Sequence, residues 1–162
     1  IPHYTEPKNL ALFEKHNVYS ESELHARESI LLMNYYQLIH IESKTMAYML
    51  RKQILPAVFE YEAELATIMQ TKKEAGIQAS LEAKVLKKIN EPLTTLDKQL
   101  DELETMNQKD FTDPHQPSRY AADELLPLMN AVRASTDTIE ENMPKKAWPI
   151  PDYNDILFQS VE

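Results

Sequence analysis

Histidine and glutamate are the residues of this sequence best suited to chemistry, because helical proteins use them together to hold iron or manganese. Such sites place a Glu three residues before a His on facing helices. None of the five histidines has a Glu three residues earlier. His25 and Glu28 stand in the opposite order, one helical turn apart, so we expect a surface pair there. The spacing therefore predicts no metal site.

Other reactive motifs are equally absent from the sequence. The chain contains no cysteine, which excludes disulfides, a thiol nucleophile and thiolate zinc ligands. It contains a single glycine, so it has no glycine-rich phosphate loop, no dinucleotide-binding fingerprint and no GxSxG elbow. We predict no catalytic, cofactor-binding or metal-binding residue in this chain. The lack of cysteine is also typical of a cytoplasmic protein.

The remaining charged groups are expected to be structural. His40 lies in an apolar stretch and should be a hydrogen-bonded core residue. Glu42, between Ile41 and Ser43, is predicted to be an interior carboxylate that pairs with Arg51 or with a neighbouring helix, or that makes an interdomain contact. The acidic run that follows later should form a solvated helix face; its members are Asp97, Asp101, Glu102 and Glu104.

The element that must position these groups is a long helix over residues 20–75. Ser20 and Glu23 form the sequence pattern of a capping box at its start. Nine of the twelve residues in the 30–41 segment are apolar, whereas polar residues recur every seventh position at Gln37, Lys44 and Arg51. We therefore predict a helix buried on most of its circumference, with a kink at Pro56.

The rest of the chain reads as further helices joined by turns. Residues 1–19 should form a loop and a short helix with Leu10, Leu12 and Phe13 facing inward. Residues 80–107 carry a heptad seam, and Ser80 can cap that helix. Residues 118–143 form the last long helix. The seam comprises Leu86, Ile89, Leu93, Leu96, Leu100 and Leu103.

Residues 144–162 form a tail rich in aromatic residues and proline, in which Trp148 is the only tryptophan. Such a tail should dock on the helices and bury part of Trp148. With one glycine and ten prolines, residues 1–162 are predicted to be a single all-α domain. The expected architecture is an up-and-down bundle of long, proline-kinked helices with a docked C-terminal tail.

The net charge of the chain excludes some classes of binding partner. The formal net charge of -9 argues against nucleic acid and against anionic membrane surfaces. The longest apolar runs are too short to span a bilayer. Because the chain begins at Ile1-Pro2 without a Met, we expect it to be a fragment of a larger protein.

Three segments resemble the C-terminal region of type III glutamine synthetases. They are ELHARESILLMNYYQLIHIESKTMAYMLRKQILPAVFEY, then ADELLPLMNAVRASTDTIE, then WPIPDYNDILF at the end. They occur in that family in the same order, and the last is the most specific. The resemblance covers residues 18–158, although residues 77–117 contribute little to it.

The resemblance implies a parent enzyme of nitrogen metabolism that joins ammonia to glutamate, using ATP and divalent metal, Mg or Mn. The family's catalytic residues lie in upstream regions, so none is assigned here. What it implies for this chain is a structural role toward the catalytic domain of the same polypeptide and toward neighbouring subunits of a homo-oligomer. Two alternatives stay open from the residues alone: an independent, coiled-coil-like interaction module, and an all-helical metalloenzyme.

Overall fold

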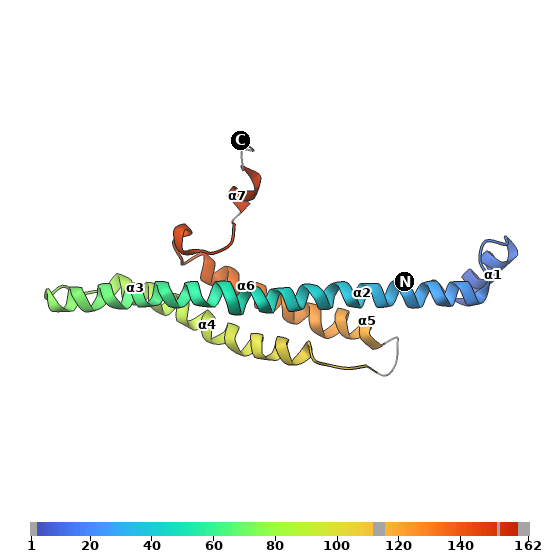
Figure 1. Cartoon of the computed structure of the whole chain (residues 1–162), viewed down its shortest axis with the longest axis horizontal. Helices are drawn as coiled ribbons and strands as arrows, with labels where there is room; N and C mark the ends of the chain where they lie inside the picture. The colour runs from blue at the N-terminus through green and yellow to red at the C-terminus, as the bar shows by residue number, and fades with distance from the viewer. Residues whose placement is uncertain (1–2, 112–115, 152, 159–162) are drawn as a thin grey trace.

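The computed structural model of the chain describes residues 3–111, 116–151 and 153–158, with only the backbone at 153 and 154. Every regular element within these residues is a helix, and the described part contains no strand. The predicted all-α bundle is therefore confirmed. Figure 1 shows a long rod with two shorter helical arms packed along one side of it.

The rod is built from α2 (Glu21–Met49), η1 (Leu50–Ile54) and α3 (Leu55–Glu74). The expected capping box opens it, since Ser20 N–H donates to Glu23 Oε2 at 2.8 Å and Glu23 N–H donates to Ser20 Oγ at 3.4 Å. It ends at Gly76, whose φ of 71° lies in the left-handed region. There Ile77 N–H donates to the carbonyl oxygen of Lys72 at 2.8 Å, the bond that satisfies the last turn of such a helix.

Two helix prolines, Pro56 and Pro127, follow π-helical turns, whereas Pro92 lies inside the α-helix Ser80–Met106 without one. The turn η1 ends at Ile54, with one residue between it and Pro56, and a second turn, η2 (Ala121–Leu125), ends likewise with one residue between it and Pro127. A π-turn widens the helix locally, so the missing amide donor and the bulk of the proline ring are accommodated there. The prediction of a kink at Pro56 is therefore wrong, because α3 continues in nearly the same direction as α2 (Figure 1).

The two shorter arms are α4 (Ser80–Met106) and the returning run of α5 (Gln116–Tyr120), η2 and α6 (Leu126–Glu140). The predicted heptad seam is confirmed, and four of its side chains are fully buried: Ile89, Leu96, Leu100 and Leu103. They meet Leu125, Val132 and Ile139 of the returning run in one core with residues of the rod. Ser80 does not cap α4, because the cap position falls on Ala79 without a side-chain bond.

The N-terminal helix α1 (Pro7–Lys15) folds back beside the start of α2. Phe13 packs between the rings of Tyr4 and Tyr19, with centroid distances of 6.0 Å and 5.7 Å. Leu12 is exposed, which contradicts the prediction that it faces inward. The aromatic cluster occupies the inner side of this short helix, and Leu12 lies on its outer side.

The tail docks with its first half only. After η3 (Lys145–Ala147), Trp148 and Ile150 are partly buried against the core, as predicted for Trp148. The short helix α7 (Tyr153–Leu157) stands away from the bundle in Figure 1, and Lys145 pairs with Asp155 at 2.6 Å. The prediction of a docked tail is therefore wrong for the far end of the tail. Three apolar side chains there are 64–77% exposed: Ile156, Leu157 and Phe158. Residues 152 and 159–162 of the predicted tail lie outside the described part.

Candidate functional site

The predicted surface pair of His25 and Glu28 does not form. His25 lies 3.9 Å from Glu21 instead. Glu28 is only 7% exposed and accepts a hydrogen bond of 2.8 Å from Thr5 Oγ1, so it ties the N-terminal segment to the rod. Among the described residues, no three His, Cys, Asp or Glu side chains gather as a metal site would require. No helix in the described part is long and apolar enough to cross a membrane.

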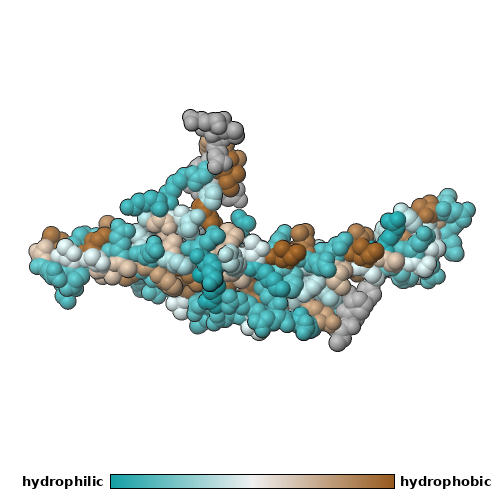
Figure 2. Space-filling model, in the orientation of Figure 1, coloured by the Kyte–Doolittle hydropathy of each residue, from teal (hydrophilic) through white to brown (hydrophobic). Residues whose placement is uncertain are grey.

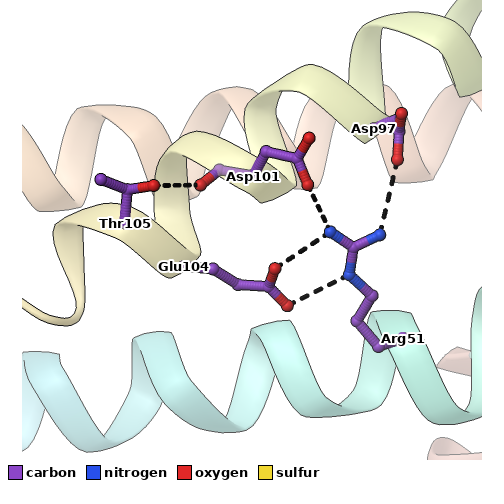
Figure 3. A network of polar contacts seen from close by, with 5 residues as sticks. All are labelled: Arg51, Asp97, Asp101, Glu104 and Thr105. Atoms are coloured by element: carbon purple, nitrogen blue, oxygen red, sulfur yellow. Dashed lines mark hydrogen bonds and ion pairs between the residues drawn. The ribbon is translucent and has the colours of Figure 1, made fainter.

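The most concentrated charge cluster joins the rod to α4 around Arg51 (Figure 3). Arg51 donates to both carboxylate oxygens of Glu104, at 3.1 Å from Nε and 3.0 Å from the second terminal nitrogen. It also donates to Asp101 at 2.5 Å and to Asp97 at 3.4 Å. Glu42 is not the partner of Arg51, and it is exposed instead of interior. The acidic run on α4 is thus more than a solvated face, because Arg51 binds three of its carboxylates.

Electrostatics identify this cluster as a structural clasp. The hydrogen bonds that Arg51 donates to Glu104, followed by the one that it donates to Asp101, raise the pKa of Arg51 further above its already high ordinary value. A two-point contact between a planar guanidinium and a carboxylate fixes geometry as well as charge. Since one cation already faces three carboxylates, the cluster fixes α4 against the rod and offers no free cation for an anionic substrate.

A second clasp, of polar and aromatic groups, holds the end of α4. His40 Nε2 donates to the carbonyl oxygen of Asn107 at 3.0 Å, and fully buried Ser43 donates to Asn107 Oδ1 at 2.8 Å. The ring of Tyr36 stacks on His40 at 5.2 Å between centroids. Tyr120 donates to the carbonyl oxygen of Met106 at 3.1 Å. His40 is therefore the hydrogen-bonded core residue that the sequence predicts.

The candidate functional site is the side of α2 that faces away from this core. Its apolar residues are between 44% and 63% exposed, and we call them the α2 stripe: Ile30, Leu31, Leu38, Ile41 and Tyr48. Their spacing of three, seven and eleven residues puts them on one face of a helix. Figure 2 shows brown patches over α2, set among hydrophilic surroundings.

The buried residues of α2 lie on the opposite face. Ile39 and Ala47 belong to the core, together with the clasp residue Ser43. The prediction that the long helix is buried on most of its circumference is therefore wrong for the described chain. Its helix has two apolar faces, and the described residues of this chain cover one of them. An apolar stripe of this length, rimmed by polar residues, is typical of an interaction surface.

Comparison with known proteins agrees with a helical domain of a larger enzyme. Residues 1–73 match the family model described as the glutamine synthetase C-terminal domain. The chain is 30% identical to a glutamine synthetase of Butyrivibrio fibrisolvens over 98% of its own length. It is 29% identical to the type-3 glutamine synthetase of Dictyostelium discoideum over 93% of its length. No solved structure matches the chain.

These alignments also run through residues 77–117, where motifs alone gave little resemblance. The chain spans 23% and 22% of the length of these two relatives. The resemblance to the C-terminal region of type III glutamine synthetases is thus confirmed. Residues 1–73 therefore match the family of glutamine synthetase C-terminal domains, and the chain as a whole is similar to the corresponding part of the glutamine synthetases.

Proposed function

We propose that this chain is the C-terminal helical domain of a cytoplasmic glutamine synthetase and that its role is assembly. In this proposal the parent enzyme ligates ammonia to glutamate with ATP and Mg or Mn, on residues outside this chain. The domain holds the catalytic part of its own polypeptide and neighbouring subunits of a homo-oligomer in place. The observation that carries the proposal is the α2 stripe, an apolar face that the described residues leave open.

The size of this face supports an assembly role. Burying a large apolar side chain completely is worth about 1.5–3 kcal/mol. The five stripe residues are roughly half exposed, so covering them would contribute several such increments. The clasps of Arg51 and Asn107 hold the opposite side of the rod, which makes the stripe a preformed surface. Preformed surfaces bind at a smaller entropic cost than mobile ones.

Two measurements on the parent enzyme test the proposal. Truncation before Ser20 is expected to abolish the native oligomer or most of the glutamine formation. Substitution of Leu38 by Glu should weaken assembly as well, since it places a charge in the middle of the stripe. Thr67→Glu is the matched control, because Thr67 is an exposed residue of the same rod that lies outside the stripe.

Activity of the isolated chain provides the complementary test. We expect these 162 residues alone to form no glutamine from glutamate, ammonia and ATP above buffer. If the truncated parent kept both its oligomer and its activity, the assembly role would be wrong. The domain would then serve a partner outside the enzyme.

A further inference from the structure

We propose that the α2 stripe is a two-fold interface on which a second copy of this chain lies antiparallel, with Leu38 opposite Ile41. The inference deepens the proposed assembly role and rests on it, because it names the partner of the same surface. A two-fold interface must be self-complementary, so that when one residue contacts another across it, the reverse contact also exists.

The residues of the α2 stripe are spaced symmetrically along the helix, as a two-fold interface requires. Leu38 and Ile41 lie at equal distances on either side of a point midway between positions 39 and 40. Leu31 and Tyr48 lie symmetrically about the same point. Antiparallel pairing about that point therefore places each apolar side chain opposite another apolar one.

The polar residues within the stripe follow the same symmetry. Asn34 and Thr45 are also equidistant from the midpoint, so they would face each other as a hydrogen-bonding pair. All six positions alternate in steps of three and four, which is the seam of a coiled coil; they are 31, 34, 38, 41, 45 and 48. The seam on α4 has the same spacing and is buried within the chain, whereas this one is open.

Surface shape provides a place for the aromatic residue of the second copy. A hollow of about 440 Å³ lies beside the N-terminal end of the stripe, lined by Tyr4, Glu23, Ala26, Arg27, Ile30 and Leu31. The antiparallel register brings Tyr48 of the second copy opposite Leu31, at the edge of this hollow. Its ring would meet Arg27, whose guanidinium already lies 4.3 Å from the ring centre of Tyr19.

Charge favours antiparallel over parallel pairing of the two copies. The chain carries a net charge of -9, and copies that met through the acidic face of α4 would repel each other. The face around the stripe is balanced, with Glu23, Arg27, Glu42, Lys44 and Lys52 exposed. Antiparallel pairing about the midpoint places Lys52 opposite Arg27 of the second copy, with Glu23 one helical turn away to offset this like-charged pair, whereas parallel pairing would place each of these five charges opposite its own copy.

Engineered cysteines test the register directly, because the chain has no cysteine of its own. The full chain is prepared as two single variants, Leu31→Cys and Tyr48→Cys, and each is oxidised alone and in a mixture. A disulfide needs Cα atoms within about 7 Å. We expect a disulfide-linked dimer in the mixture and none with either variant alone. Cross-linking of each variant with itself would mean parallel pairing and would overturn the proposal.

Sedimentation of the unmodified chain gives the second measurement. We expect a dimer that is lost in Leu38→Glu and retained in Thr67→Glu, with unchanged helical circular dichroism in both variants. A monomer at all concentrations, without mixed cross-linking, would overturn the inference. If truncation of the parent still abolished its oligomer, the proposed assembly role would stand and the stripe would belong to the catalytic part instead.

Discussion

Arg51 donates two parallel hydrogen bonds, of 3.1 Å and 3.0 Å, to Glu104 across the interface between the rod and α4 (Figure 3). A lysine at position 51 would keep the charge but lose the planar fork. We therefore expect Arg51→Lys to lower the free energy of unfolding by about 1 kcal/mol, since both side chains are partly exposed. Urea denaturation measures this, and the loss should shrink at high salt because screening weakens the native pair.

Arg133→Lys is the control for this change. Arg133 pairs with Asp137 one turn away on the same helix at 3.7 Å and is well exposed. Its replacement should leave the free energy of unfolding within about 0.5 kcal/mol of the native value. Equal losses for the two variants would show that the clasp on Arg51 contributes no more than an ordinary surface pair.

The heptad register of α4 can be tested by substitution at a buried and at an exposed position. Leu96 is fully buried, so Leu96→Asp would place a charge in the core without a partner. We expect a loss of roughly 3 kcal/mol or more, seen as a large drop in the urea midpoint. The neighbouring Asp97→Ala should cost about 0.5 kcal/mol or less, because Asp97 is mostly exposed and its contact with Arg51, at 3.4 Å, is a long one. Similar midpoints for the two variants would contradict the register of the seam.

The sequence predicts the elements of this fold better than their contacts. The helical periodicity and the capping box at Ser20 are local signals, and each appears in the structure where it was expected. The pairing of Glu42 with Arg51 failed because a partner on another helix depends on how the helices pack. Glu104 lies 53 positions from Arg51, and no local pattern connects the two.

The sequence shows the apolar residues of the α2 stripe, but it does not show that they are exposed. Nine apolar residues in the 30–41 segment are too many for a single buried face, and this excess underlies the prediction of burial on most of the circumference. The alternative, one face covered by the chain and one open, has the same composition. Only packing distinguishes the two, because a sequence pattern reports which faces are apolar and not which neighbour covers them.

Trp148 reports on the docking of the tail. Its ring is partly buried against the core, and its Nε1 is buried without a hydrogen-bond partner. Phe would keep most of the apolar contact and remove the unpaired donor, so Trp148→Phe should cost less than about 1 kcal/mol. Trp148→Ala should cost about 2 kcal/mol, because it removes the contact itself. Thermal denaturation separates the two variants, and an alanine variant as stable as the native chain would show that the tail is not docked.

Glu62 on α3 gives the chain a predictable dependence on pH. One oxygen of its carboxylate is buried without a partner, and burial raises the pKa of Glu62 above its usual 4.5. The folded state therefore holds the proton more tightly than the unfolded state does. Its contribution to stability is fully present below the unfolded pKa and is lost as the pH rises through the folded pKa.

The variant Glu62→Gln removes this titration while keeping the shape of the side chain. We expect it to unfold at higher urea than the native chain at pH 7, where the native carboxylate is charged and poorly solvated. At pH 3 the two proteins should have nearly the same midpoint, since the native carboxyl is then neutral as well. Glu60→Gln is the control, because Glu60 is exposed on the same helix and should give no difference at either pH. A gain for Glu62→Gln that was equal at both pH values would mean that lost charge is not its cause.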